Sequence, residues 1–257
     1  MIKLSLNGAL GRMGTTILEL CLLDKEIKIV GLADISPVKK IYDNHDLPAV
    51  EKTLEKYIEN TDVVVDFSSP EGTQQVLILC KTYKKPIVIG TTGHSEDQVK
   101  KIKEASQEIP VLLSPNMSLG VNLMFKLIEL TTKTLKNENY DIEIVEAHHN
   151  KKKDAPSGTA KKIMEIIKQI QPETNFVFGR NGIIGERKPN EVGISVIRAG
   201  DIVGEHLVLY STYGERLEIK HTATSRQTFA KGALLAAKWL VKNQKAGLYT
   251  MYDVLNI

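Results

Sequence analysis

Chemistry-bearing side chains are concentrated in residues 146–160 of the 257-residue chain. His148 and His149 carry imidazoles, whose unperturbed pKa of about 6.5 suits an acid or a base near neutral pH. His148 ends an alternating apolar pattern that predicts a strand. Lys152 follows in a predicted loop, where it can reach back as a cation. These residues predict a centre of proton transfer.

A helix is predicted to begin directly after this loop. Pro156 suits the start of a helix, and Ser157 suits its N-cap. The first amides of that helix, at Gly158 and Thr159, are suited to a carboxylate or a phosphate. A proton donor, a cation and an anion-binding helix end together suit the reduction of an anionic substrate.

Other interpretations of these residues are a metal site and a solvated basic turn. Adjacent histidines lack the i, i+4 spacing of a helical zinc pair, and no cysteine is near them, so no metal site is predicted. A run of three lysines usually forms a solvated turn. We expect this of Lys151 and Lys153, and we keep Lys152 as a candidate.

A second group of candidates is a glycine-containing turn between the first predicted strand and helix, Gly8-Ala9-Leu10-Gly11-Arg12-Met13-Gly14. Glycine permits close approach of the backbone, and a helix N-terminus attracts a pyrophosphate. The match to the dinucleotide-binding fingerprint is imperfect, because Ala9 occupies the position of its usual first glycine. The alternative is an ordinary turn. Residues 8–13 are candidates for binding NADH or NADPH.

Asp34 lies about 20 residues beyond the last glycine, where an acid bonds the ribose hydroxyls of a dinucleotide. The alternative is a solvated acid or a turn-former before Ser36 and Pro37. An acid repels a 2′-phosphate, and Ile35 stands where an arginine would accommodate one. We therefore predict a preference for NADH over NADPH, which Lys39 and Lys40 would soften.

Two further segments follow predicted strands, at the strand ends where such sheets bind ligands. One comprises Gly90, Thr91 and Thr92, and the other comprises Ser114, Pro115, Asn116 and Met117. Both are candidates for contact with the nicotinamide, although glycine and Pro-Asn are also ordinary turn-formers.

The elements that would position these residues begin with short apolar runs that alternate with helical patterns. This alternation is typical of βαβ units in a parallel sheet buried on both faces. The predicted strands are 2–7, 27–33, 62–67, 86–90 and 110–114, and the predicted helices are 12–23, 74–83 and 96–107. The first half is therefore predicted to be an α/β domain with a Rossmann-like, doubly wound parallel sheet.

After Val121 the rhythm changes. The predicted order is a helix over 119–135, a strand over 141–149, a helix after Pro156, strands over 192–198, 206–212 and 216–221, and an amphipathic helix over 229–241. Gly200, Gly204 and Gly214 are assigned to short turns between the last strands. We predict a C-terminal α+β domain whose mixed or antiparallel sheet is covered by helices on one face.

Composition limits the class of protein. Hydrophobic residues at 42% and charged residues at 25% are ordinary globular values, and the length suits one large or two modest domains. A net charge of +3 is too balanced for a general nucleic-acid binder. Cys21 and Cys80 lie in apolar helical patterns and are expected to be buried thiols. No apolar run approaches the roughly 20 residues of a membrane span, and no leader pattern precedes the first strand, so we expect a cytoplasmic protein.

Residues 143–160, EIVEAHHNKKKDAPSGTA, resemble the signature of the dihydrodipicolinate reductase family. The resemblance covers essentially the whole chain. It includes GRMG at 11–14, DF at 66–67, PEG at 70–72, GTTG at 90–93, Asn116, RAGDIVGEH at 198–206, GER at 214–216, SR at 225–226 and FA at 229–230. The segment from the paired histidines to Ser-Gly-Thr is highly specific, whereas the glycine turn alone is not.

The resemblance implies reduction of a cyclic, conjugated imine dicarboxylate to tetrahydrodipicolinate by NADH or NADPH, in diaminopimelate and lysine biosynthesis. Water is lost when the hydroxylated form is the starting point. By motif position, His148 is implied to be the proton donor and Lys152 its catalytic partner. His149 and the backbone of Gly158 and Thr159 are implied to hold the substrate carboxylates. The implied cofactor contacts are residues 8–13, Asp34, residues 90–92 and residues 114–117.

The family is typically a homotetramer assembled through the sheet of the second domain, and its last helix returns to the nucleotide domain. We therefore expect residues 1–117 and 227–257 to form the dinucleotide-binding domain, and residues 118–226 to form the substrate-binding and oligomerisation domain. The sequence departs from the family at Ile35 and Ser69, where members that use NADPH well often carry basic residues. Both departures favour NADH.

Two rival functions differ in what they require of the sequence. Another two-domain oxidoreductase, such as a sugar or aldehyde dehydrogenase, would need a lysine or cysteine at a different strand–helix junction. Its neutral substrate would not need an anion-binding helix end. A non-catalytic nicotinamide sensor or nucleic-acid-binding protein would bind without turnover, or would have a larger basic face. Neither accounts for residues 143–160.

Overall fold

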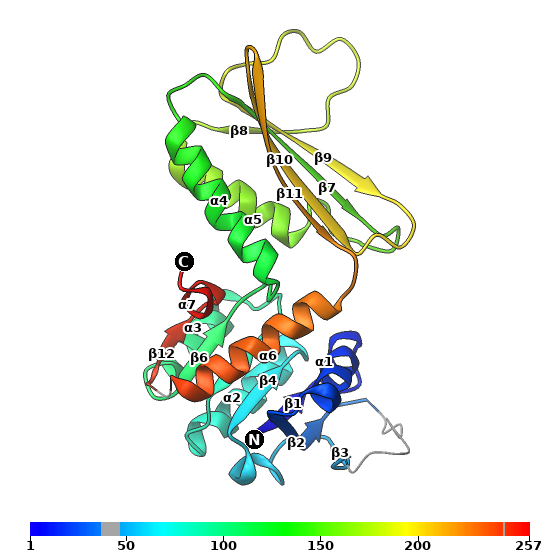
Figure 1. The fold of residues 1–257 in the computed structure, drawn as a ribbon, viewed down its shortest axis with the longest axis vertical. Helices are drawn as coiled ribbons and strands as arrows, with labels where there is room; N and C mark the ends of the chain where they lie inside the picture. Colours follow the sequence, from blue (N-terminus) through cyan, green and yellow to red (C-terminus); the bar gives the residue numbers. More distant parts are fainter. Residues whose placement is uncertain (37–46, 244) are drawn as a thin grey trace. The chain divides into compact units, whose positions relative to one another are not determined.

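A computed structural model describes residues 1–36, 47–243 and 245–257. The chain divides into two compact units, the first formed by residues 1–119 with 226–257 and the second by residues 120–225 (Figure 1). The sequence analysis placed the division near 118 and 226. The functions that it assigns to the two units stay a prediction.

The first unit contains a seven-stranded sheet in which every neighbouring pair of strands is parallel. Its order is β12-β6-β5-β4-β1-β2-β3. The strands are β1 (Ile2–Asn7), β2 (Ile27–Ala33), β3 (Val50–Glu51), β4 (Val63–Asp66), β5 (Ile87–Ile89), β6 (Pro110–Leu113) and β12 (Gly247–Tyr249). The predicted parallel α/β sheet is confirmed.

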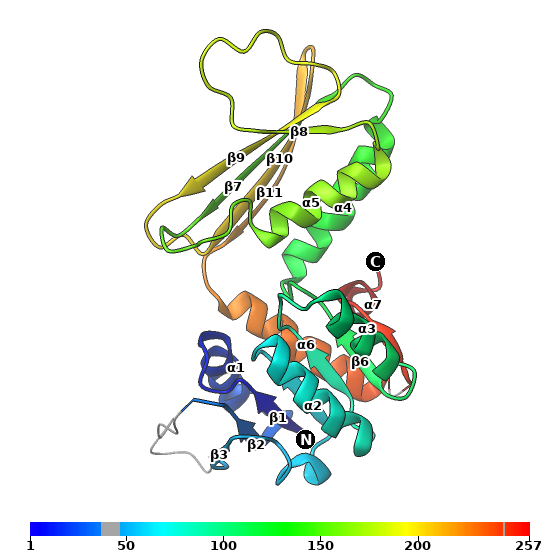
Figure 2. The same cartoon turned by 180° about the vertical axis from the view of Figure 1, so that it is seen from behind.

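Helices cover both faces of this sheet (Figures 1 and 2). α1 (Arg12–Leu23) and α6 (Gln227–Lys242) pack on one face with Val63 and Val65 of β4. α2 (Pro70–Thr82) and α3 (Glu96–Ala105) pack on the other with Val64. Successive side chains of a strand point to opposite faces, so a continuous apolar strand serves two cores. A short 3₁₀ helix (Ile58–Asn60) and α7 (Met251–Leu255) complete the unit.

The sheet changes its direction of winding at β1. The chain leaves β1 through α1 to β2 on one side, whereas β4 pairs with β1 on the other. A crevice forms at the carboxyl ends of the strands at such a point, and ligands of open α/β sheets bind there. The glycine turn at residues 8–14 follows β1 and therefore lies at this position.

The second unit contains a five-stranded mixed sheet in the order β11-β10-β7-β9-β8. β10 is antiparallel to both β11 and β7, while β7–β9 and β8–β9 are parallel pairs. The elements are α4 (Leu119–Leu135), β7 (Asp141–His148), α5 (Gly158–Ile170), β8 (Asn175–Phe178), β9 (Glu191–Arg198), β10 (Gly204–Thr212) and β11 (Glu215–Ala223). α4 and α5 lie on one face of the sheet, as predicted (Figures 1 and 2).

Several predicted boundaries are wrong for physical reasons. Gly204 was assigned to a turn, but it opens β10 and pairs with Ala223. α2 begins at Pro70 rather than at 74, because the Ser69 hydroxyl accepts a hydrogen bond from the Gly72 amide and caps the helix. The short elements β3, β8, β12 and α7 were not predicted, because two to five residues carry too little periodicity.

Cys21 and Cys80 are buried, unpaired thiols in α1 and α2, as predicted. Among the described residues, no helix has the length and apolar character needed to cross a membrane.

Candidate active site

Strand β7 places His148 at its carboxyl end, facing the helix-covered side of the sheet together with Glu146. The alternation of the strand requires this, because the buried Ile142 and Ile144 lie on the same side. His148 is directly opposite Arg198 of β9, and Glu146 is directly opposite His206 of β10. Three strands therefore bring four polar side chains to one point.

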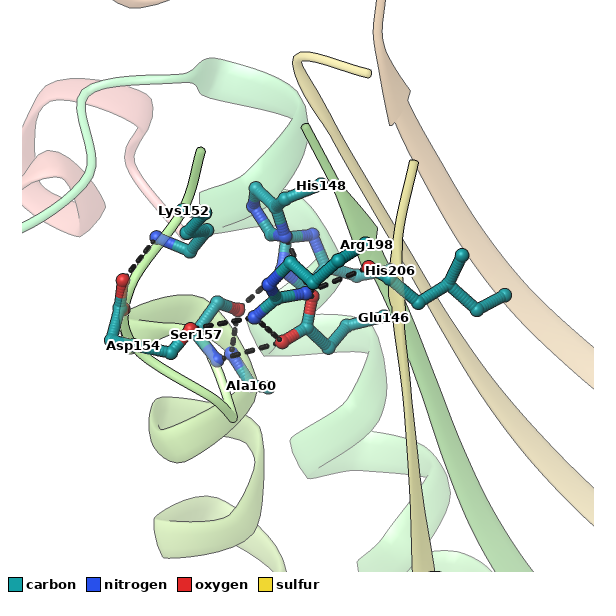
Figure 3. Close-up of polar contacts among 9 residues, drawn as sticks. Glu146, His148, Lys152, Asp154, Ser157, Ala160, Arg198 and His206 are labelled. Atoms are coloured by element: carbon teal, nitrogen blue, oxygen red, sulfur yellow. Dashed lines mark hydrogen bonds and ion pairs between the residues drawn. The ribbon is translucent and has the colours of Figure 1, made fainter. Parts of the chain in front are cut away.

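Glu146 is the centre of this group, although its exposed fraction is 0%. Its Oε2 lies 2.6 Å from His148 Nδ1 and accepts a 2.8 Å hydrogen bond from Arg198 Nη1. Its Oε1 accepts from Arg198 Nη2 at 2.8 Å and from the Ser157 amide at 2.9 Å (Figure 3). A buried carboxylate is tolerated only when it is paired and hydrogen-bonded in this way.

Ser157 ties the start of α5 to the same group. Its hydroxyl accepts from the Ala160 amide at 3.2 Å, which makes it the N-cap of α5, as predicted. The same hydroxyl lies 3.0 Å from His206 Nε2. The helix N-terminus carrying Gly158 and Thr159 is thus held close to Glu146, and Gly158 is exposed.

His148 Nε2 faces Gly204, the first residue of β10. A Cβ at that position would lie 3.0 Å from Nε2, closer than ordinary van der Waals contact. The rings of His148 and His206 meet edge to face, with centroids 5.2 Å apart. Glycine therefore leaves space beside the nitrogen that Glu146 does not occupy.

Lys152 lies half-buried in the loop after β7, and its Nζ forms an ion pair with Asp154 Oδ1 at 2.9 Å (Figure 3). Its amide donates to the carbonyl of His149, which is also half-buried. Lys151 and Lys153 are exposed. The loop presents one shielded cation between two solvated ones.

Burial and the neighbouring charges shift the pKa values of Glu146, His148 and His206. Burial raises the pKa of Glu146, but hydrogen bonds from Arg198, His148 and Ser157 outweigh it and hold the pKa below its ordinary value. Burial lowers the pKa of His148, against the opposing effect of Glu146. Burial, with a smaller contribution from His148, lowers the pKa of His206 to about 3. His206 is therefore neutral, and His148 takes up a proton less readily than a free imidazole.

Among the residues that the structure describes, no group of three or more His, Cys, Asp or Glu side chains is arranged to hold a metal ion.

The glycine turn of the first unit has the conformation that its sequence requires. Gly8 has φ +81°, and a Cβ there would lie 2.3 Å from the Phe67 carbonyl oxygen. A Cβ at Gly14 would lie 2.0 Å from the Gly8 oxygen. Gly8 thus permits the close backbone approach expected of the first glycine of the fingerprint, although it lies one residue earlier in the sequence. Arg12, the first residue of α1, and Gly11 are exposed, Leu10 and Met13 are half-buried, and Ala9 is buried.

A cavity of about 350 Å³ opens beside this turn. Its lining includes Gly8, Leu10, Gly11, Asp34, Ile35 and Lys52. The Asp34 carboxylate accepts hydrogen bonds from the amides of Leu10 and Ser36, both at 2.8 Å. Asp34 therefore stabilises the glycine turn through Leu10. It also forms a local turn with Ser36, which is the alternative role that the sequence suggests for it. Lys39 and Lys40 lie outside the described residues.

The first of the two later segments, residues 90–92, lies beside Asp66, a buried carboxylate for which the sequence predicts no role. Thr91 donates to Asp66 at 2.7 Å, and Asn7 and Thr73 also donate to it. The Thr91 side chain is therefore committed to the scaffold, whereas Thr92 is exposed. A Cβ at Gly90 would lie 2.2 Å from the Phe67 ring.

In the second of these segments, Ser114 donates to the Asn116 carbonyl, and Asn116 accepts from the Ser118 amide. Pro115 is exposed, while Met117 is buried in the core. Any contact of Met117 with a ligand would therefore have to come from its backbone.

Sequence reasoning assigned no role to Glu146, Arg198, Ser157 beyond its cap, or His206. The signal available was weak: Glu146 stands two residues before His148 and so shares its face of the strand. Arg198 and His206 stand about 50 residues further along the chain, and only the sheet register brings them to His148.

Comparison with known proteins agrees with this geometry. Residues 2–117 match the family model described as "Dihydrodipicolinate reductase, N-terminus", and residues 120–255 match "Dihydrodipicolinate reductase, C-terminus". A relative from Aquifex aeolicus (strain VF5), named 4-hydroxy-tetrahydrodipicolinate reductase, is 47% identical over 265 residues, covering 100% of this chain and 99% of its own length. A relative of the same name from Hahella chejuensis (strain KCTC 2396) is 44% identical over 269 residues, with both chains covered completely.

Solved structures share the fold. A dihydrodipicolinate reductase from Paenisporosarcina sp. TG-14 with dipicolinate bound has a TM-score of 0.78 and 23% identity, with 98% of each chain covered. A probable dehydrogenase from Thermotoga maritima has a TM-score of 0.60 and 13% identity, covering 98% of this chain and 92% of its own.

Proposed function

The chain belongs to the dihydrodipicolinate reductase family, and from this premise we propose that it reduces 4-hydroxy-tetrahydrodipicolinate to tetrahydrodipicolinate. The reaction is a step of diaminopimelate and lysine biosynthesis, and we place it in the cytoplasm. The observation that carries the proposal is the cluster at the end of β7, where an imidazole, a cation and a helix N-terminus lie together.

His148 is the general acid of this proposal. Loss of the 4-hydroxyl as water gives the conjugated imine, and nicotinamide nucleotide, when bound, would supply the hydride that adds to it. His148 holds a proton at Nε2 for the substrate nitrogen, where negative charge would otherwise develop. A positioned general acid contributes about 10²–10⁴-fold to a rate. Glycine at position 204 avoids the crowding of this nitrogen that a Cβ would cause.

The substrate carboxylates are held by His149 and the first amides of α5 at Gly158 and Thr159, and Lys152 is the catalytic partner of His148. Lys152 pairs with Asp154, and the bound substrate takes the place of Asp154. A helix N-terminus favours an anion through its dipole and its amides. A dicarboxylate suits a site with two such anion-binding groups.

The first unit holds the nicotinamide nucleotide at the crevice beside β1. Residues 8–13, Asp34, residues 90–92 and residues 114–117 are its proposed contacts, and the cavity beside Gly8 fits them. We place NADH ahead of NADPH, because Asp34 repels a 2′-phosphate and Ile35 supplies no cation. Lys52 also lines this cavity and is the cation that would moderate the preference.

The assembly that we propose is a homotetramer formed through the second sheet. The face of this sheet opposite α4 and α5 carries Val145, Leu207, Leu209 and Ile197, and Ile197 is 47% exposed. These partly exposed apolar side chains, which share the face with Glu143 and Glu205, support an interface there. Light scattering coupled to gel filtration measures the mass, and a monomer at micromolar concentration would contradict the tetramer.

The enzyme assay tests the function directly. Substrate is generated from pyruvate and aspartate semialdehyde by the preceding enzyme, and oxidation of NADH and NADPH is followed separately. We expect turnover with a lower KM for NADH. His148→Gln should lower kcat about 10²-fold or more while nucleotide binding survives. Absence of oxidation with either nucleotide would overturn the proposed function.

A further inference from the structure

Both oxygens of Glu146 are fully used as acceptors. A carboxylate that receives two Arg198 N–H groups and the Ser157 amide is ionised and has no proton to give. The nitrogen of His148 that lies 2.6 Å from Oε2 must therefore be the donor. Neutral His148 thus carries its hydrogen on Nδ1, and Nε2 is the atom that gains or loses the second proton.

The charged and titratable groups that face His148 come from every element around it. Glu146 lies on its own strand, Arg198 on β9, His206 on β10, and Lys152 in the following loop. Arg198 and Lys152 disfavour a positive charge on the imidazole, and so does burial of the ring. Glu146 is the one member of this set that favours it. Without Glu146, burial of the ring, Arg198 and Lys152 would all oppose the protonated form.

Arg198 has a separate part in this arrangement. Its guanidinium spans both oxygens of Glu146 and also donates to the Asp154 carbonyl at 2.6 Å. It keeps Glu146 ionised inside the protein and aims Oε2 at His148 (Figure 3). A planar, bidentate guanidinium suits this task better than a lysine.

We propose that Glu146 is a positioning residue for the reduction: it fixes the tautomer of His148, aims Nε2 at the substrate, and holds the proton there until the hydride arrives. The inference rests on the proposed function, in which His148 is the acid. It differs from a purely structural role, in which the Glu146–Arg198 pair would only join β7 to β9. A structural role predicts lower stability but no change in the titration of His148.

The first test is the pH dependence of kcat for Glu146→Gln. Activity requires protonated His148, so it falls as the pH rises through the pKa of that residue. Removing the negative charge lowers this pKa, and the alkaline limb of the profile should move to lower pH. Loss of the orienting acceptor should also reduce kcat about 10²-fold at neutral pH.

Glu143→Gln is the matched control. Glu143 lies three residues earlier on β7, is half-buried, and is also bound by two arginines, Arg180 and Arg187. It points to the opposite face of the sheet and does not contact His148. We expect an unchanged pH profile, because Glu143 does not contact His148. A profile of Glu146→Gln that matches the wild-type profile would overturn the inference.

A second measurement determines the tautomer in the wild-type protein, and the His148→Gln variant serves only to assign the signals. Magic-angle-spinning NMR of protein with ¹⁵N-labelled histidine distinguishes the two neutral tautomers, and the His148 signals are identified by their loss in His148→Gln. We expect the Nδ1–H tautomer, and an Nε2–H tautomer would overturn the inference. If the enzyme assay failed, the proposed function would fall, while the tautomer would still be decided by this spectrum.

Discussion

Replacement of Ser157 by alanine tests how the substrate-binding helix end is built. The Ser157 hydroxyl caps α5 through the Ala160 amide and contacts His206 Nε2. Loss of an N-cap costs about 0.5–2 kcal/mol. Loss of the partner of a buried nitrogen costs about 1–3 kcal/mol, and His206 Nδ1 already lacks a partner among the described residues. The two effects together predict about 1.5–5 kcal/mol of lost unfolding free energy.

Ser157→Gly separates these two contributions. Glycine is almost as good an N-cap as serine and costs only a few tenths of a kcal/mol there, but it cannot contact His206. Ser157→Gly should therefore lose about 1 kcal/mol less than Ser157→Ala. The substrate KM should rise in both variants, because the start of α5 loses its side-chain contact with His206.

Urea unfolding followed by far-ultraviolet circular dichroism measures the difference. Trp239, the single tryptophan, lies in α6 of the first unit, so its fluorescence follows that unit separately. The reasoning is refuted if Ser157→Ala loses less than about 0.5 kcal/mol, or if Ser157→Gly loses at least as much as Ser157→Ala.

Further variants test the other assignments. Lys152→Ala should lower kcat/KM about tenfold or more, because a charge-assisted bond contributes about 1.5–3 kcal/mol. Lys151→Ala should leave kcat/KM unchanged, and equal values for the two variants would remove Lys152 from the site. Asp34→Ala should raise the ratio of NADPH to NADH activity by removing the charge that repels a 2′-phosphate; an unchanged ratio in the kinetic assay would contradict this. Gly8→Ala should weaken NADH binding in a fluorescence titration, since its Cβ would meet the Phe67 carbonyl oxygen; native affinity would show that the turn is not the site. Burial lowers the pKa of His206 to about 3, whereas an unfolded histidine titrates near 6.5, so below about pH 6.5 the unfolded state takes up the proton first. The urea concentration at the unfolding midpoint should therefore decrease as the pH is lowered from about 7 to about 4, and it should decrease less in His206→Gln. The same dependence of the midpoint on pH in both proteins would argue against a neutral buried His206.

The elements with strong local signals could be predicted closely. The helix at Arg12–Leu23 and the strand at Ile27–Ala33 have the predicted bounds, because their hydrophobic periodicity acts over a few residues. Elements that depend on a distant partner were missed. β8 has only four residues and forms because β9 offers it an edge to pair with.

The candidate site shows the same division. The chain by itself determined that His148 ends a strand, that Ser157 caps a helix, and that Lys152 stands between them, since each rests on neighbours within a few positions. The tertiary structure alone decided that Arg198 and His206 reach that strand end, and that Gly204 is a strand residue beside an imidazole rather than a turn. The physical reason is strand register. The pairing of strands about 50 residues apart in sequence determines which side chain lies opposite His148. A shift of this pairing by one residue would turn that side chain to the other face of the sheet.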